Sequence, residues 1–237
     1  PHRPHVPHHD TRVENRSDAG RRAPPPIPAA DTLMGMQVIE VYADVWCPFA
    51  HVGIRRVVER RDALGADAVL RVQPWPLELV NGRPMDAAFI GEEVVDIRDQ
   101  VAPDLFAHFD DHAFPTSTLP ALALVEAAYE VDLATGERAS TLVRDALFEQ
   151  GRDVGDPAAL HDLARDLGVA EVTDRHRQAV LDAWQQGTQR GVVGSPHFFT
   201  PNGAFFCPAL DISRVDGHLR IRAKAGMFDE FLNAAFG

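Results

Sequence analysis

Thiols, lysine and long apolar runs are scarce in this sequence. Its 237 residues contain two cysteines, Cys47 and Cys207, and one lysine, Lys224. Two cysteines far apart in the chain are too few for a disulfide framework or a four-ligand zinc site. No apolar run reaches the roughly 18 residues of a membrane-spanning helix, and the N-terminus lacks the apolar segment of a secretory signal. We therefore expect a cytoplasmic protein with both thiols reduced.

Positive charge is also in short supply. The chain has 23 basic and 35 acidic residues, a net charge of −12. Such a balance argues against a non-specific grip on nucleic acid or on anionic lipid, so neither is an expected partner. The apolar fraction of 45% is ordinary for a globular protein and allows a sizeable core.

Residues 1–35 differ in composition from the rest, being rich in proline, histidine and arginine without apolar periodicity. We predict a disordered tail, because such a segment buries too little surface to offset its ordering entropy. Its histidines either bind a metal adventitiously or are simply solvated, and we predict no metal site in the protein. These histidines are His2, His5, His8 and His9. Met34 and Met36 follow closely, so whether the natural product contains the tail is left open.

The remainder predicts an α/β fold. A β-branched run at 37–43 reads as a strand, 48–64 as a helix ended by Gly65, and 68–72 as a second strand. A helix crossover makes the two strands parallel neighbours.

Residues 83–190 read as mostly helical, loosely so over 83–113. The predicted helices are 119–129 with Thr118 as cap, 137–148, a helix begun by Asp156 and Pro157 and ended by Gly168, and 173–191. The Asn202-Gly203 pair predicts a hairpin of strands 196–200 and 204–207, followed by a last helix at 228–236. We predict a thioredoxin-like domain (36–82 and 191–237) whose mixed sheet receives a helical insertion at 83–190.

Cys47 stands where the first predicted strand ends and the first helix begins. Unpaired backbone N–H groups and the positive end of the helix dipole favour a thiolate there, which predicts a lowered pKa for Cys47. Pro48 suits the first helical turn, since its missing N–H would have no partner. The alternative is a buried structural cysteine.

Four motifs, in order, resemble the DsbA-like thioredoxin-fold oxidoreductases, with the FrnE-like branch the closest group. They cover nearly all of residues 36–236. The four are Trp46-Cys47-Pro48-Phe49-Ala50-His51, Trp75-Pro76-Leu77-Glu78-Leu79, Leu147-Phe148-Glu149 with Gly151-Arg152-Asp153-Val154-Gly155-Asp156, and Gly191-Val192-Val193-Gly194-Ser195-Pro196-His197-Phe198. The last resembles the stretch that carries the family's cis-proline, which implies a cis Ser195-Pro196 bond. A trans proline that opens an edge strand is the alternative.

The sequence departs from the family at Ala50, where that branch has its second cysteine. A dithiol site resolves a mixed disulfide internally, and Ala50 cannot. The resolving thiol would then be a small thiol, mycothiol or glutathione, or else Cys207, which the family's topology places on the edge of the active site. The alternative, and the favoured one for Cys207, is an ordinary strand-end cysteine, since free cysteine is commonly buried.

Several neighbours of Cys47 are candidate site residues. His51, four residues on, would either acidify the thiol or take its proton, unless it is a partly buried residue at an aromatic position. His197 is weighed in the same way. A cis bond would turn the backbone of Ser195 toward the thiol, where an extended peptide or thiol tripeptide can pair with it. Side chains expected either to line a groove or to join the core are Trp46, Phe49, Phe198 and Phe199.

We predict a thiol-dependent oxidoreductase with Cys47 as nucleophile, His51 and Pro196 as further catalytic residues, and Trp46, Pro48, Phe49, Ser195 and His197 around the substrate. No cofactor is expected to bind tightly. The expected partners are a small thiol and a disulfide or small electrophile, and the oligomeric state is left open. One alternative is a thiol-dependent transferase or isomerase, like the related kappa-class glutathione transferases and hydroxychromene carboxylate isomerases. The other is a redox-inactive binding domain.

Overall fold

The computed structural model describes residues 36–216 and 218–236, so the predictions for residues 1–35 lie outside the described residues. The elements follow in the order β1 (Gln37–Ala43), α1 (Pro48–Leu64), β2 (Ala68–Pro74), α2 (Leu77–Asn81), α3 (Ala87–Gln100), the 3-10 helix η1 (Asp111–Ala113), α4 (Leu119–Val131), α5 (Leu133–Phe148), α6 (Pro157–Leu167), α7 (Asp174–Gln189), β3 (His197–Thr200), β4 (Gly203–Phe206), β5 (Leu210–Val215), β6 (His218–Ala223) and α8 (Ala225–Phe236). Within the described ranges, no helix combines the length and apolarity needed to cross a membrane.

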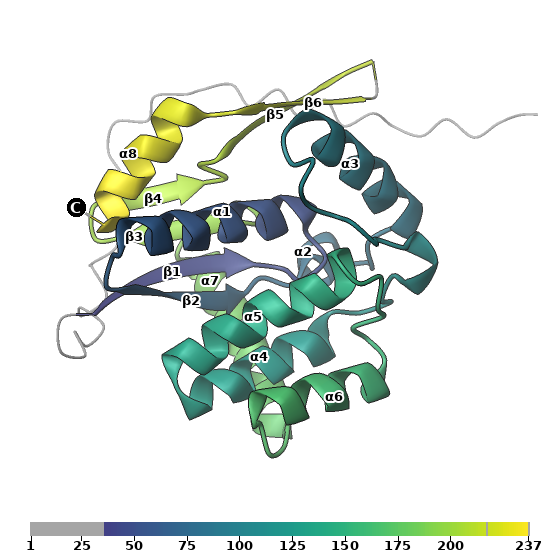
Figure 1. The fold of residues 1–237 in the computed structure, drawn as a ribbon. Helices are drawn as coiled ribbons and strands as arrows, with labels where there is room; N and C mark the ends of the chain where they lie inside the picture. Colours follow the sequence, from purple (N-terminus) through teal and green to yellow (C-terminus); the bar gives the residue numbers. More distant parts are fainter. Residues whose placement is uncertain (1–35, 217, 237) are drawn as a thin grey trace, which may run out of the picture.

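A mixed four-stranded sheet lies at the centre, in the order β2-β1-β3-β4 (Figure 1). β1 pairs parallel with β2 and antiparallel with β3, in a register that sets Val41 opposite Val72 and Phe198. Alternate side chains of β1 point to opposite faces. Val41 packs in a cluster with α1 and α8, whereas Tyr42 packs with Trp75 and Trp184 on the side of α7. The sheet is therefore covered by helices on both faces.

Helix α1 has the predicted bounds. Cys47 is its N-cap, Pro48 occupies the first turn, and Gly65 ends it in the left-handed conformation with φ of 61°. Only a residue without Cβ adopts that φ without cost, which explains why the helix ends at this position. The sequence pattern alone was enough to place the element that carries the candidate nucleophile.

Side chains of α4 and α5 cover the outer edge of β2. The Tyr129 hydroxyl accepts the N–H of Val72 and donates to the Leu70 carbonyl, both at 2.8 Å. The Leu70 N–H donates to Glu137 at 2.5 Å. A Cβ on Gly136 would lie 2.0 Å from the Tyr129 ring, so glycine there makes the hydroxyl's approach possible. The edge has its backbone groups paired and is closed to another strand.

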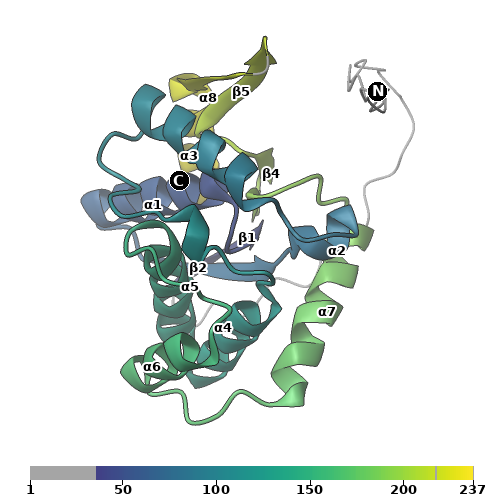
Figure 2. The same ribbon diagram turned by 90° about the vertical axis from the view of Figure 1, so that its right-hand side faces the viewer.

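A second hairpin, β5–β6, was missed by the sequence interpretation. It forms its own two-stranded sheet. The side chain of Gln100, at the end of α3, accepts the N–H of Ile221 and donates to the Leu219 carbonyl, both at 3.0 Å. In Figures 1 and 2, α3 and this hairpin lie on one side of α1, and α4, α5 and α6 lie on the other. The helices predicted as one insertion are thus divided between two sides of α1, and the domain boundaries remain a prediction.

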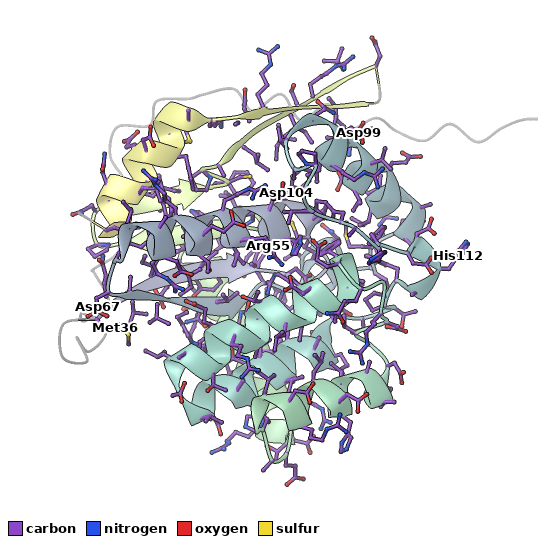
Figure 3. All side chains as sticks on the ribbon, in the orientation of Figure 1. Met36, Arg55, Asp67, Asp99, Asp104 and His112 are labelled. Atoms are coloured by element: carbon purple, nitrogen blue, oxygen red, sulfur yellow. The ribbon has the colours of Figure 1, made fainter. Side chains whose placement is uncertain are left out.

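Ion pairs join α1 to its surroundings on both sides. Arg55, labelled in Figure 3, pairs with Asp145 on α5. Arg56 pairs with Asp104, in the segment after α3, at 2.6 Å. Helix α1 therefore sits between the two groups of helices, with its N-terminus directed at the candidate site.

Candidate functional site

The sulfur of Cys47 lies at the N-terminus of α1, beside the loop that enters β3. The Cys47 carbonyl accepts the N–H groups of Ala50 and His51, both at 3.1 Å, which closes the first turn. Its thiol donates to the Ser195 carbonyl at 3.2 Å, across 148 residues of sequence. The Ser195-Pro196 peptide is cis. The structure therefore brings together Cys47, Ser195 and Pro196, three of the predicted site residues.

The thiol is buried rather than open to solvent, with 4% of Cys47 exposed. Burial raises the pKa of Cys47 to about 11, while the hydrogen bonds with Ser195 and with the Ala50 N–H act in the opposite direction. The predicted lowering of the pKa was therefore wrong for this conformation. The N-terminus of the helix does stabilise the thiolate, but the loss of hydration on burial destabilises the thiolate by more.

A buried polar network braces the junction just before Cys47. Asp44 is fully buried and accepts the Val45 N–H and the Thr118 hydroxyl, each at 2.7 Å, as well as the Leu77 N–H. Its own N–H donates to the Ser195 hydroxyl at 3.0 Å. Thr118 was predicted to cap α4 with its side chain, but its hydroxyl is used by Asp44 instead. Asp44 thus ties the strand end to three distant segments.

Arg144, on α5, belongs to the same buried network. Its guanidinium donates to the Asp44 carbonyl at 3.0 Å and to the Ser140 hydroxyl and carbonyl at 2.6 and 2.8 Å. Burial lowers the pKa of Arg144 to about 10 and raises the pKa of Asp44 to about 6, against the attraction between the two charges. At neutral pH both groups are ionised, and each stabilises the other in a site closed to water.

His51 is fully occupied by a different partner. Its Nε2 lies 2.6 Å from Glu149, the C-cap residue of α5, and its ring contacts Phe106 and Phe148 with centroids 5.3 and 5.1 Å away. Burial lowers the pKa of His51, although Glu149 opposes the shift. The neutral ring donates its Nε2 proton to the carboxylate. This geometry favours the aromatic-position interpretation, and the role of His51 as a base stays a prediction.

Glu149 links the same histidine to the loop after α3. It accepts the N–H groups of Phe106 and Ala107 at 3.0 and 3.1 Å. Phe106 has a φ of 64°, a left-handed conformation that residues with a side chain rarely adopt. Burial on its own would raise the pKa of Glu149, but His51 and the two N–H groups lower it to about 2. The carboxylate holds this loop against the first turn of α1.

Trp46 and His197, which were also predicted to lie around the substrate, are both buried. Trp46 is fully buried and stacks on Phe114 with centroids 5.7 Å apart, so in this conformation it belongs to the core and not to a groove. His197 is also buried, with Nδ1 accepting the Val193 N–H at 3.2 Å and its ring stacked on Phe199. Burial lowers the pKa of His197. Neither side chain is open to solvent.

Pro48, Phe49 and Phe198 also lie within this packing. Pro48 and Phe198 are buried, and partly buried Phe49 contacts the clusters on both sides of α1. A Cβ on Gly53 would approach the Pro196 ring to 3.2 Å, so the glycine lets α1 lie close against that proline.

Cys207 contacts the carbonyl of the next residue in the same loop, Pro196. It follows β4, is 4% exposed, and donates its N–H to the Pro196 carbonyl at 3.0 Å. Burial raises the pKa of Cys207 to about 12, and a negative charge on Cys47 acts in the same direction. Both cysteines are free thiols.

Sequence reasoning missed Asp44, Arg144 and Glu93. Asp44 ends a buried strand three residues before the nucleophile, and Arg144 stands on the apolar face of its helix; both patterns were visible. Glu93 lies in the loosely predicted segment and offered no signal. It pairs with Arg214 at 2.6 Å, and burial raises its pKa to about 7.

Glu93 also borders a cavity of about 920 Å³ between α3, η1 and β5. The rim of this cavity is acidic, with Glu92, Asp96 and Asp111 among its residues. Next to it, Asp110, Asp111 and His112 offer three exposed oxygen and nitrogen ligands within 4.8 Å, an arrangement that exposed acidic groups often adopt without an ion.

Several solved structures share the fold of this chain. No curated protein matches the chain. Among solved structures, a Nitrosomonas europaea protein provisionally described as a protein disulfide isomerase aligns with a TM-score of 0.58 at 20% identity, over 84% of this chain and 98% of its own. The cytosolic disulfide reductase DsbM from Pseudomonas aeruginosa aligns at 0.55 and 15%, over 83% and 97%. A 2-hydroxychromene-2-carboxylate isomerase aligns at 0.55 and 14%, over 72% and 88%.

These similarities establish a shared thioredoxin-like fold. The model of the DSBA-like thioredoxin domain matches residues 38–220, which include both cysteines and the Ser195-Pro196 loop. This chain belongs to the DSBA-like thioredoxin domain family.

Proposed function

We propose that this protein is a thiol-disulfide oxidoreductase in which Cys47 is the thiol that attacks the substrate. The observation that carries the proposal is the position of the Cys47 sulfur, at the N-terminus of α1 and 3.2 Å from the carbonyl of Ser195, next to Pro196. A sulfur there gains the helix N–H groups on ionisation and has a backbone carbonyl beside it for substrate recognition.

The described conformation is a resting state of this enzyme. Burial raises the pKa of Cys47 to about 11, so it is a thiol at pH 7. Its S–H is held by the Ser195 carbonyl. An extended peptide, or the amide of a small thiol, that donates an N–H to this carbonyl competes with the Cys47 thiol for it. Substrate binding would then free the sulfur and bring polar groups to it.

The freed thiolate attacks one sulfur of a disulfide R–S–S–R′. The bond Cys47–S–S–R forms, the substrate bond breaks, and R′S⁻ leaves with the electron pair and takes up a proton. Ala50, one turn along α1, offers no thiol to break the mixed disulfide. Resolution therefore falls to an external small thiol, glutathione or mycothiol, or to Cys207. One structural neighbour, DsbM from Pseudomonas aeruginosa, has been solved with GSH.

The remaining site residues position this chemistry. Asp44 and Arg144 hold the strand end and the Ser195 hydroxyl, so the loop keeps its carbonyl directed at the sulfur. Glu149 and His51 hold the first turn of α1 against the loop at Phe106. None of these four groups contacts the sulfur by a described hydrogen bond, and each acts as a positioning residue.

A coupled assay tests the proposal. Reduction of hydroxyethyl disulfide is followed with glutathione and, separately, with mycothiol, each regenerated enzymatically. We expect turnover by the wild type and a loss of at least about 100-fold in Cys47→Ser. Asp62→Ala, an exposed substitution near the C-terminal end of α1 after which the fold is checked by circular dichroism, serves as control. Equal rates for the wild type and Cys47→Ser would refute the proposal.

A thiol-dependent isomerase or transferase is the second candidate, and Ala50 is the observation that favours it. A site without a resolving cysteine suits a thiol cofactor that stays bound while a small aromatic substrate reacts. Conjugation of an electrophile such as 1-chloro-2,4-dinitrobenzene, without disulfide turnover, would support this candidate. If neither activity occurs, the burial of Cys47 favours the redox-inactive binding domain.

A further inference from the structure

Two buried cysteines contact consecutive backbone carbonyls of one loop. The Cys47 sulfur hydrogen-bonds the carbonyl of Ser195, and the Cys207 N–H bonds the carbonyl of the next residue, Pro196. The β3–β4 register pairs His197 with Phe206, so the following pair in the hairpin is Pro196 with Cys207. The topology thus returns the second cysteine of the chain to the loop that the first one contacts.

The two cysteines belong to different buried clusters. Cys207 packs with Trp46, the residue just before Cys47, whereas Cys47 itself packs with residues of β1, α1 and α8. Both cysteines are equally hidden from solvent, with 4% exposed. A negative charge on Cys47 raises the pKa of Cys207, as expected for two thiols within electrostatic range of each other.

Cys207 also has an unusual backbone. Its φ is 44°, and it stands between the end of β4 and Pro208. This left-handed conformation is energetically unfavourable for a residue with a side chain, and such positions cluster at functional sites. The neighbouring strand β4 is exposed over most of its length, and Phe206 is half exposed. The Cys207 side of the loop therefore has the fewer contacts to lose in a local movement.

We propose that Cys207 is the resolving thiol of Cys47. This inference rests on the proposed oxidoreductase function and replaces the external thiol in its second step. After Cys47–S–S–R has formed, the Cys207 thiolate attacks the Cys47 sulfur. The bond Cys47–S–S–Cys207 forms, the bond to R breaks, and RS⁻ leaves and is protonated. Two molecules of a small thiol then reduce the internal disulfide, the first by forming a mixed disulfide and the second by releasing it as the oxidised thiol.

A limiting amount of 5,5′-dithiobis(2-nitrobenzoate) distinguishes the two routes. With half an equivalent of reagent, the wild type should release about two thionitrobenzoate ions for each reagent molecule and retain no adduct. Cys207→Ser should release about one and retain the adduct on Cys47. Intact mass after acid quenching, and a linked peptide that contains both cysteines, identify the products. Cys207→Ala repeats the test with a different side chain, and thermal melts check that both variants fold.

The outcomes separate the two proposals. Retention of the adduct by the wild type, to the same extent as in Cys207→Ser, would overturn the role of Cys207 and leave Cys47 as a monothiol nucleophile. If the wild type and Cys207→Ser both leave the reagent unreacted, or if Cys47→Ser reacts as fast as the wild type, the proposed function itself fails.

Discussion

The strand-to-helix junction around Cys47 and the C-terminal segment around Cys207 hold their cysteines in different ways. Side chains from α4 and α5 converge on Asp44 at the junction, and both backbone groups of Asp44 are bonded. Cys207 is held by backbone hydrogen bonds to Pro196 and Leu210, at the end of an exposed strand. The attacking thiol therefore follows a segment braced by side chains, whereas the second thiol is held by the backbone of its own hairpin and turn. Substitutions of the side chains near Cys47 test whether they hold the junction as described.

Asp44→Ala should have the largest effect on stability. It leaves the N–H groups of Val45 and Leu77 without their buried acceptor. It also removes the carboxylate charge near the guanidinium of Arg144, whose hydrogen bond to the residue-44 carbonyl remains. Breaking such a buried network costs about 3–5 kcal/mol of unfolding free energy, measured by urea denaturation. As a control, Asp62→Ala removes an exposed acid on α1 and should change the free energy of unfolding by less than about 0.5 kcal/mol. Equal effects of the two substitutions would contradict the role of the network.

Glu149→Gln should have an intermediate effect, about 1–3 kcal/mol, because the amide is a weaker acceptor for His51 and for the Phe106 N–H. The wild type should show a pH signature. The pKa of Glu149 is lowered from 4.5 to about 2 in the folded state, so its contribution is complete above pH 4.5 and is lost as the pH falls toward 2. The variant should lose less stability over this range. An unchanged acid profile would argue against the contact, and Glu59→Gln on α1 is the matched control.

Glu93→Gln, which also replaces the ion pair with Arg214, should have the smallest effect on the site, a change in the reactivity of Cys47. After burial, the negative charges of Glu93 and Asp44 contribute to the raised pKa of the thiol. Removal of one of them should increase the iodoacetamide alkylation rate of Cys47 at pH 8 by about twofold, because the thiolate fraction rises. Glu92→Gln, its exposed neighbour, should leave the rate unchanged. A slower rate in Glu93→Gln would show that Glu93 instead assists ionisation.

Sequence patterns were reliable where a local rule sets the structure. Helix α1 was predicted with correct bounds because its proline and glycine mark both ends. The first turns of α5 were missed, since the cap Asp132 stands next to the end of α4 and the two helices read as separated by a longer loop. The β5–β6 hairpin was missed although Asp216-Gly217 is a turn signal, because its strands carry several charges and its stability depends on α3.

The candidate site shows the same division. Cys47, Ser195 and Pro196 were found from motifs, whereas Asp44 and Arg144 act through contacts between residues 100 positions apart. No local pattern reports such a contact. His51 was expected near the thiol from its spacing on the helix, but Glu149, 98 residues away, determines the direction of its ring.

By itself, the sequence determined that a cysteine caps a helix at the end of a parallel strand, because strand, proline and helix periodicity are local properties. The protonation state of that cysteine was decided only by the tertiary structure. The helix dipole acts within one turn, but water is removed by side chains from the whole chain. In the described structure, the loss of hydration on burial destabilises the thiolate more than the helix dipole stabilises it. The sulfur is therefore a thiol that donates to the Ser195 carbonyl.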